Sequence, residues 1–228
     1  MTVYNINLGI GWASSGVEYA QAYRSTIFKN TGIKAKFVFM DMFLQDNLSD
    51  LTRNMGFEDE DVIWLYSYFT DLKIAPTTYT VKDLEKEIPY DITRREINGK
   101  VVKLFCAKED IFYAAYLRKE GEDIVHRVEK VSRGCLIRKD FYSYTKMFTE
   151  YYTPVDNKAH LYQRRFFNED GSVAYDEIVD GITNAFGQKN LPGINVKHRK
   201  GFIEINVYIR CLYGYNVIDI AKQLQSEI

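Results

Sequence analysis

The sequence of 228 residues contains few cysteines, and the three present, Cys106, Cys135 and Cys211, lie far apart. An odd number without paired spacing does not fit the disulfide framework of a small secreted domain and favours reduced thiols in a cytoplasm. The sequence also lacks a signal-peptide pattern, and no apolar run approaches the roughly 20 residues that a membrane span needs. We therefore expect a cytoplasmic protein.

An excess of charge of one sign is also absent. The 30 Lys and Arg residues nearly balance 31 Asp and Glu residues, which gives a formal net charge of −1. This composition provides no broad basic field and argues against nucleic acid as the main partner. Histidine is rare, and His126 and His160 stand alone inside strand-like segments, with no second ligand at metal spacing. We expect both to face solvent on a sheet and predict no metal site.

Aromatic residues are abundant, with 18 Tyr and 14 Phe. Ring side chains pack well on pleated faces and contact surfaces, so this composition favours strands. From residue 90 onward, short strand-like segments alternate with turns, and Asn98-Gly99 is a hairpin signal. The pattern predicts an antiparallel meander. Its predicted strands cover residues 101–106, 111–117, 124–131, 136–144, 146–152 and 159–167.

The first 40 residues show a strand, turn, helix and strand pattern. Residues 3–8 alternate between two faces at the period of a strand, and Ser15 and Glu18 form a capping box that starts a helix at Gly16 or Val17. Residues 36–40 are continuously apolar, as in a buried parallel strand, so the whole is a βαβ unit. One apolar face of the helix is predicted from Val17, Ala20, Tyr23 and Ile27.

The glycine-rich turn before this helix is a candidate anion site. Free N–H groups at a helix start that follows glycines can bind a phosphate. However, the turn lacks the third glycine of the dinucleotide fingerprint, and the phosphate-loop and nucleophile-elbow patterns are absent. A plain turn whose glycines only relieve backbone strain is the alternative.

Acidic residues offer two further candidate sites. Asp41 ends the second strand, where a Rossmann acid would hold a ribose, but without the third glycine we expect it to cap the turn. The acidic run at residues 58–61 precedes an apolar segment, and such runs more often favour a helix start or are solvated than bind a metal. Helices are predicted over residues 44–55, closed by Gly56, and over residues 80–88.

Residues 5–24 read N-I-N-L-G-I-G-W-A-S-S-G-V-E-Y-A-Q-A-Y-R and resemble the N-terminus of the glycosyltransferase A family of the accessory Sec system. Similar strings occur at residues 62–78, 134–144 and 161–171, and the likeness ends near Gly181. This family transfers N-acetylglucosamine to Ser and Thr of serine-rich-repeat adhesins in streptococci and related bacteria. The resemblance implies a two-Rossmann (GT-B) transferase whose first Rossmann half carries an inserted extended sheet domain.

The expected fold class is α/β, in three parts. Residues 1–89 form a partial Rossmann-like βαβ segment from the N-terminal half of the GT-B fold, residues 90–181 form the antiparallel meander, and residues 182–228 form a small ββα tail. The tail resembles part of an alkaline-shock envelope protein domain. Its predicted strands cover residues 194–196 and 202–212, and its helix residues 217–228.

The resemblance also implies that the sugar-nucleotide-binding Rossmann domain is missing past Gly181. A rearranged or misjoined reading frame would explain the change. No catalytic residue, cofactor or metal is therefore assigned to this chain, although UDP-N-acetylglucosamine is the implied donor. The donor and acceptor cleft of the family is assigned to Gly11, Ser14, Ser15 and Gly16.

Basic and aromatic residues interleave at residues 137–146 and 161–167. Such interleaving can stack nucleobases, but the near-neutral charge and the resemblance favour a polypeptide-binding surface or plain sheet packing. The resemblance implies a partner subunit of similar architecture and a Ser/Thr-rich adhesin as partners. The complex would lie free in the cytoplasm or peripheral to the cell membrane. The anchors assigned to the partner or acceptor surface are Tyr142, Tyr144, Arg164 and Phe166.

Two functions therefore stand side by side. One is the N-terminal portion of the N-acetylglucosamine transferase, inactive alone. The other is a non-catalytic interaction module that binds the partner subunit or the acceptor polypeptide.

Overall fold

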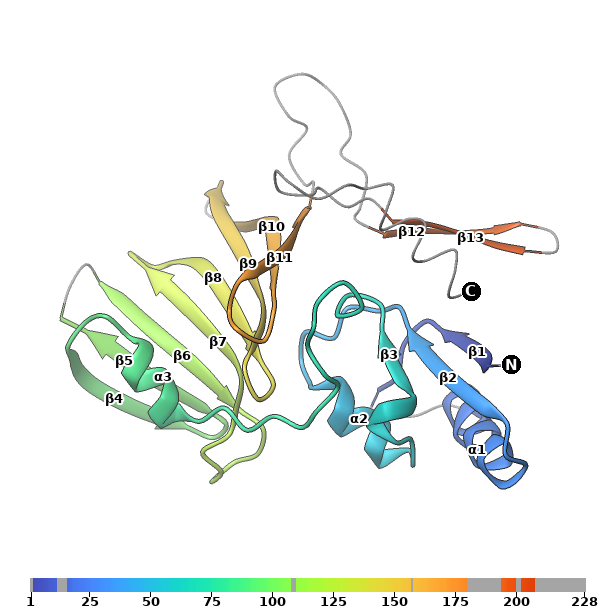
Figure 1. Ribbon diagram of the computed structural model, residues 1–228. Helices are drawn as coiled ribbons and strands as arrows, with labels where there is room; N and C mark the ends of the chain where they lie inside the picture. The colour runs from blue at the N-terminus through green and yellow to red at the C-terminus, as the bar shows by residue number, and fades with distance from the viewer. Residues whose placement is uncertain are drawn as a thin grey trace, which may run out of the picture.

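Two sheets make up most of the structure, a computed structural model in which residues 2–11, 16–107, 110–156 and 158–179 are described, together with the strands at 194–199 and 202–207. A three-stranded parallel sheet comes first, and an eight-stranded antiparallel sheet follows it (Figure 1). The predicted α/β class, a βαβ segment followed by an antiparallel meander, is confirmed. Among the described residues, no helix is long and apolar enough to cross a membrane.

The parallel sheet has the strand order β1-β2-β3. Helix α1 begins at Gly16, as the capping-box spacing predicts, and ends where Gly32 adopts a φ of +69° that glycine tolerates best. Helix α2 is shorter than the predicted 44–55, because the Asn47 side chain accepts a hydrogen bond from the Ser49 N–H (2.8 Å) and caps the helix there. The elements are β1 Thr2–Asn7, α1 Gly16–Asn30, β2 Lys34–Phe39, α2 Leu48–Asn54 and β3 Val62–Trp64.

The predicted apolar face of α1 points away from the sheet. Val17, Tyr23 and Ile27 are 69%, 71% and 58% exposed. The side that packs on β2 is instead lined by smaller or half-buried side chains, with Ser25 fully buried and Phe28 partly buried. Helix α1 therefore packs on the sheet with the side that carries Ser25, and not with the predicted apolar face.

The acidic run is part of the scaffold. Asp59–Asp61 form a 3-10 helix, η1, directly before β3. Arg53 of α2 pairs with Asp59 at 2.6 Å, and Lys29 of α1 pairs with Glu58 at 3.2 Å. Within the described residues, no group of three or more His, Cys, Asp or Glu side chains could hold a metal ion. These acids tie the two helices to the start of β3.

In the antiparallel sheet each strand pairs with its neighbours in the chain, from β4 at one edge to β11 at the other. Every predicted strand is present, and the predicted turn at Asn98-Gly99 joins β4 to β5 with Gly99 at a φ of +55°. The strands are β4 Ile92–Asn98, β5 Val101–Cys106, β6 Ile111–Leu117, β7 Val125–Ser132, β8 Cys135–Tyr142, β9 Lys146–Val155, β10 Lys158–Phe167 and β11 Val173–Ile178.

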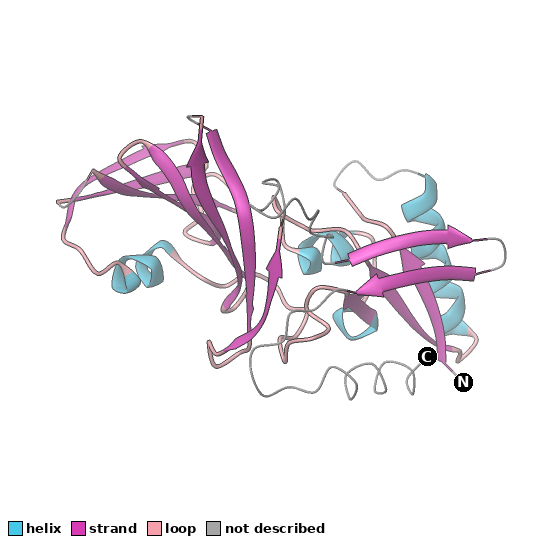
Figure 2. Cartoon of the chain, turned by 90° about the horizontal axis from the view of Figure 1, so that it is seen from above, coloured by secondary structure: helices cyan, strands magenta, loops and turns pink. Residues whose placement is uncertain are grey.

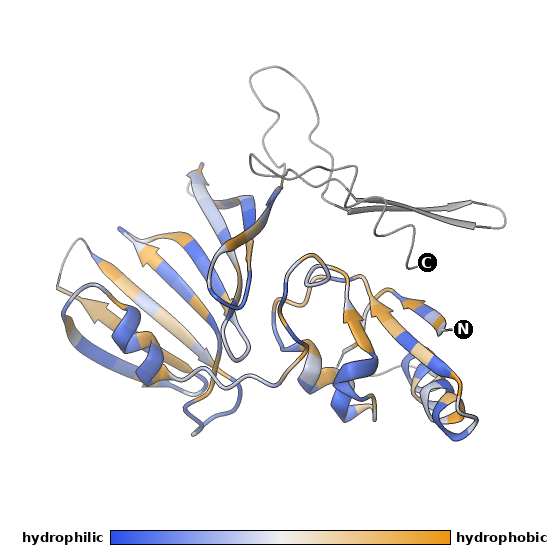
Figure 3. Cartoon of the chain, viewed as in Figure 1, coloured by the Kyte–Doolittle hydropathy of each residue, from blue (hydrophilic) through white to orange (hydrophobic). Residues whose placement is uncertain are grey.

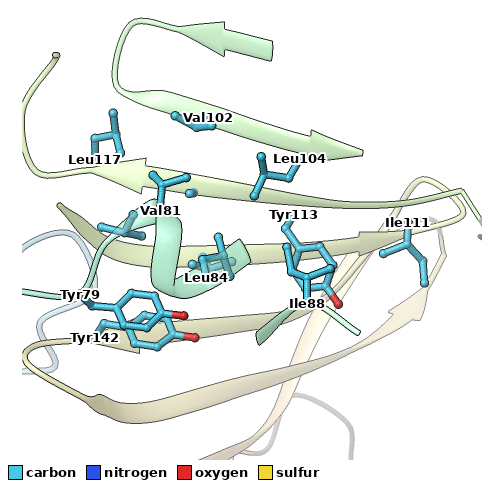
Figure 4. Close-up of a cluster of buried hydrophobic side chains, with 13 residues drawn as sticks. Tyr79, Val81, Leu84, Ile88, Val102, Leu104, Ile111, Tyr113, Leu117 and Tyr142 are labelled. Carbon is cyan, nitrogen blue, oxygen red and sulfur yellow. The ribbon is translucent and has the colours of Figure 1, made fainter. Parts of the chain in front are cut away.

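Helix α3 (Val81–Glu87) covers one face of this sheet (Figure 2). A capping box between Thr80 and Asp83 starts the helix, and Val81 and Leu84 point into an apolar cluster on β5 to β8 (Figure 4). In the same cluster the rings of Tyr79 and Tyr142 stack at 3.8 Å. This cluster is the first of two cores.

The second core joins the two sheets. Four aromatic side chains from β8, β9, β10 and β11 lie in one cross-strand row on the face opposite α3, and they stack at 4.3, 5.2 and 4.4 Å. Trp64 and Tyr66 of the N-terminal segment pack against this row. Hydrophobic residues of β2 and β3, coloured orange in Figure 3, belong to this core. The row consists of Phe141, Phe148, Phe166 and Tyr175.

Strands β12 (Ile194–Arg199) and β13 (Phe202–Val207) pair antiparallel, so the two predicted tail strands are present. The predicted helix at residues 217–228 lies outside the described residues. Cys106 and Cys135 are free thiols, and Cys211 also lies outside the described residues.

The prediction that His126 faces solvent is wrong. It is half-buried on β7, and burial, aided by the nearby Arg127 charge, lowers its pKa from 6.5 to about 4. The folded chain therefore keeps this imidazole neutral at a pH where the unfolded chain protonates it. The stability that depends on His126 is complete above about pH 6.5 and is lost as the pH falls toward 4.

We predict that acidification from pH 7 to pH 4.5 costs the chain about 2–3 kcal/mol through His126 alone. His126→Gln should remove this part of the pH dependence, because glutamine does not titrate. Urea unfolding of both proteins at several pH values measures it. An equally steep loss of stability in His126→Gln would assign the effect to other groups.

Candidate functional site

A surface cavity of about 590 Å³ opens at the carboxyl ends of β1 and β2, beside the start of α1. Open α/β sheets bind their ligands at this end. The polar residues that line the cavity include Asn7, Glu18, Gln21 and Asp41. Its described lining residues include two acids and no basic side chain, so the cavity by itself favours a neutral polar ligand over a diphosphate.

The glycines predicted to line the cleft lie next to this cavity. A Cβ placed on Gly11 or Gly16 would meet no atom within 4 Å, so packing does not require glycine at either position. Ser14 and Ser15 lie outside the described residues. The open space at both glycines is compatible with a ligand and equally with the plain turn that is the alternative.

Gly9 is the glycine of this turn that another side chain approaches most closely. A Cβ there would lie 2.4 Å from Oδ2 of Asp41, because that side chain lies directly over the turn. The Asp41 N–H donates to the Leu8 carbonyl (2.7 Å), and its carbonyl accepts from Nε1 of Trp64 (2.8 Å). Asp41 therefore closes the turn, as expected of a capping residue.

The residues predicted as partner anchors lie mostly inside the protein. Tyr142 and Phe166 are each only 1% exposed, in the first and the second core respectively. The Tyr144 hydroxyl accepts a hydrogen bond from the Lys73 N–H at 3.1 Å. This placement does not agree with a role as surface anchors for Tyr142 and Phe166, because α3 covers the side of β8 that carries Tyr142 and the N-terminal segment covers the side of β10 that carries Phe166.

Arg164 belongs to a buried ion-pair network. Its Nε lies 2.9 Å from Oε1 of Glu150, and its Nη1 lies 3.0 Å from Oε2 of Glu177. Burial opposes the charge, but the carboxylates of Glu177 and Glu150 outweigh it and raise the pKa of Arg164. Arg164 therefore stabilises β9, β10 and β11 against one another.

The sheet presents another surface that the sequence interpretation missed. On the face opposite α3, basic and aromatic side chains alternate across β4, β5 and β6. The Arg94 guanidinium lies 3.9 Å from the centre of the Phe105 ring, and the Phe105 and Phe112 rings lie 5.4 Å apart. The alternation of basic and aromatic residues with apolar ones at every second position of residues 92–116 could have indicated this surface. We call this surface the open face and define it by Arg94, Lys103, Phe105, Phe112 and Tyr116.

The open face continues toward the buried network. The Arg127 guanidinium lies 3.8 Å from the centre of the Tyr116 ring, and the Tyr116 hydroxyl donates to Glu129 at 2.9 Å. Lys139 pairs with the same Glu129 at 3.3 Å. These contacts hold the side chains of the open face in place before any partner binds, which lowers the entropy cost of binding.

Comparison with known proteins finds a family model, a relative and two solved structures that match this chain. Residues 94–190 match the family model of the GtfA extended beta-sheet domain. Over 186 residues the chain is 55% identical to the UDP-N-acetylglucosamine--peptide N-acetylglucosaminyltransferase GtfA subunit of Streptococcus agalactiae, which covers 82% of this chain and 37% of that relative. The chain therefore spans well under half the length of this curated relative.

Two solved structures also match this chain. One is the pneumococcal O-GlcNAc transferase GtfA in complex with UDP and GlcNAc, with a TM-score of 0.80 and 46% identity over 99% of this chain and 41% of that one. The other is a GtfA/B complex, with a TM-score of 0.79 and 51% identity over 91% of this chain and 39% of that one. None of these comparisons supports the expected likeness of residues 182–228 to an alkaline-shock envelope protein, and the family model runs past Gly181 to residue 190.

Proposed function

Because the chain is similar in sequence and fold to the N-terminal portion of GtfA subunits, we propose that it acts as part of an N-acetylglucosamine transferase. The donor is UDP-N-acetylglucosamine, and the acceptors are Ser and Thr of a serine-rich-repeat adhesin in the accessory Sec system. The observation that carries this proposal is the 55% identity over 186 residues to a GtfA subunit.

In this proposal the cavity beside Gly11 and Gly16 binds uncharged parts of the substrates, the acceptor peptide or the sugar. The leaving diphosphate needs preorganised positive charge, and the described lining of this cavity has acids at Glu18 and Asp41 and no base. That charge must come from outside the cavity. We therefore expect no catalytic residue among the described residues that line this cavity, and we expect the chain to be inactive alone.

The test is turnover by the purified chain. We expect no release of UDP from UDP-N-acetylglucosamine, with or without a Ser/Thr-rich acceptor peptide. Release of UDP above the buffer background would show that the catalytic charges lie in this chain. It would overturn the proposal that the charge for the leaving diphosphate comes from elsewhere.

A second function, the non-catalytic interaction module, is favoured by the open face. Aromatic and Arg side chains are enriched at protein interfaces, and here they are already held in place by cation–π contacts. Because one matching structure is a GtfA/B complex, we propose that this face binds a GtfB-like partner subunit.

Truncation of the open face should weaken that complex. The double variant Arg94→Ala, Phe105→Ala is expected to lower the affinity for a GtfB subunit about 30-fold, as the loss of about 2 kcal/mol of interface energy requires. Tyr162→Ala, a 40% exposed aromatic on β10, is the matched control and should bind normally. Calorimetry against purified GtfB measures both, and undiminished binding by the double variant would place the interface elsewhere.

A further inference from the structure

Another surface cavity, of about 430 Å³, lies on the eight-stranded sheet beside α3. Three parts of the chain line it: α3 with the residue before its cap, the turn between β8 and β9, and the turn between β10 and β11. Its volume is within the range of small-molecule sites, about 300–1,000 Å³. Among the described residues it shares none of its lining with the cavity beside Gly11 and Gly16, so a ligand here would be additional to one bound there.

The Tyr79 hydroxyl is the group that points to a ligand in this cavity. Tyr79 lines the cavity and is only 7% exposed, and its Oη is buried and makes no hydrogen bond with any described residue. Its ring stacks on Tyr142 at 3.8 Å, and Figure 4 shows the two hydroxyl oxygens pointing the same way. A buried hydroxyl without a partner costs free energy, so a ligand group that hydrogen-bonds to Tyr79 would recover that cost.

Both phenols of the lining can donate a proton to a ligand. Burial, together with the nearby Glu87 charge, raises the pKa of Tyr79, so its hydroxyl stays protonated at neutral pH. The Tyr144 hydroxyl accepts a hydrogen bond from the Lys73 N–H at 3.1 Å, which leaves its own proton for another acceptor. The cavity therefore suits a ligand that carries acceptor oxygens.

The charges of the lining favour a neutral ligand. Glu87 of α3 pairs with Lys146 of β9 at 3.7 Å, and both side chains reach solvent, with exposures of 48% and 29%. Asp83 is engaged in the capping box of α3. One carboxylate balanced by one ammonium group offers acceptors and donors without an excess of either charge, as a polyhydroxylated ligand requires. The rings of Phe167 and Tyr144 add aromatic surface, on which the C–H groups of a sugar ring can pack.

We propose that this cavity binds an N-acetylated pyranose sugar, carried by an acceptor polypeptide that has already been modified. The acetamido group has a carbonyl that accepts from the Tyr79 hydroxyl and an N–H that donates to the Glu87 carboxylate. This inference rests on the proposed function, because that function supplies a product rich in such sugars. A modified segment held here keeps the next Ser or Thr at a high effective concentration near the transferase. Free N-acetylglucosamine has the same chemistry, and the experiment separates the two sources.

The test is binding of sugars to the full chain, measured by calorimetry and saturation-transfer NMR. The probes are methyl N-acetylglucosaminide, methyl glucoside, a Ser/Thr-rich peptide that carries N-acetylglucosamine, and the same peptide without sugar. We expect the glycopeptide to bind more tightly per sugar than the free glycoside, and the glucoside to bind more weakly than either. Tyr79→Phe should lower the affinity for both N-acetylated probes about fivefold to tenfold, as the loss of one hydrogen bond requires.

Tyr113→Phe is the matched control, because Tyr113 is a tyrosine of the same apolar cluster, is 3% exposed and does not line the cavity. It should leave the sugar affinity unchanged. Tyr79→Phe should leave the unliganded chain at least as stable as the parent, since it removes a buried hydroxyl that has no partner. Urea unfolding checks this, and a clear loss of stability would show that the hydroxyl is already paired and would overturn the proposal.

Other results would overturn the proposal as well. They are no binding of either N-acetylated probe, equal binding by Tyr79→Phe and the parent, or equal binding of glucoside and N-acetylglucosaminide. Tighter binding of a lysine-rich peptide than of the glycopeptide would show a cation site instead, and equal affinity per sugar for glycoside and glycopeptide would refute the modified polypeptide as the source. All these experiments measure binding and not transfer. Failure of this site therefore leaves the proposed transferase function untouched, and sugar binding would stand even if that function were refuted.

Discussion

Phe166→Ala is expected to destabilise the chain by about 3–5 kcal/mol, the range for truncating a buried phenylalanine. Phe166 is only 1% exposed and lies between Phe148 at 5.2 Å and Tyr175 at 4.4 Å. Its ring also stacks on Tyr66 of the N-terminal segment at 5.8 Å. Removing it leaves a cavity where the two sheets meet, so the cost includes lost contacts in both. Urea unfolding followed by far-UV circular dichroism measures the change.

Tyr162→Ala is the matched control, because Tyr162 is an aromatic residue on the same strand, β10, and is 40% exposed. Its truncation should cost less than about 1 kcal/mol. Equal costs for the two variants would contradict the placement of Phe166 in a core shared by the two sheets.

Arg164→Met should cost a similar amount, about 3–5 kcal/mol, because it leaves two buried carboxylates without their counter-ion. The side chains of Glu150 and Glu177 are only 1% and 7% exposed, and Arg164 contacts both at 2.9 and 3.0 Å. The triple variant Arg164→Met, Glu150→Gln, Glu177→Gln should regain most of the stability, since no net charge then remains buried at this point. Chemical denaturation of the single and triple variants gives the comparison.

Arg165→Met provides the control for the charge change itself. Arg165 lies next in the chain on the opposite face of β10, is 33% exposed and pairs with Asp176 at 2.8 Å. A pair this exposed contributes about 1 kcal/mol or less. If Arg164→Met cost no more than Arg165→Met, or if the triple variant were as unstable as the single one, the buried network would not stabilise the sheet.

Local chemistry accounts for the parts of the fold that were predicted well. The capping box at Ser15 and Glu18 predicted a start of α1 at Gly16 or Val17, and α1 begins at Gly16, because a cap involves only residues within one turn. The Asn98-Gly99 hairpin and the meander were predicted for the same reason, since a two-residue turn and a strand period of two are set by neighbouring residues. The likeness to GtfA subunits was also evident in the sequence, because long and unusual strings matched.

Side-chain placement was predicted less well. Period-two alternation shows that the residues on either side of Tyr142 point the opposite way, but it does not show which face another element covers. Here α3 covers one face and the parallel sheet covers part of the other, so Tyr142 and Phe166 are both buried although they belong to opposite cores. The same ambiguity hid the half-buried His126.

The sequence by itself therefore determined the βαβ start, the antiparallel meander, the starts of the first and third helices, the Asn98-Gly99 turn and the family resemblance, because each depends on residues close together in the chain. Only the tertiary structure decided which of these faces are buried. It placed Arg164 between two acids, Asp41 over Gly9, and the apolar side of α1 in solvent. The physical reason is that burial depends on which distant elements meet, and the pattern within one element leaves that choice open.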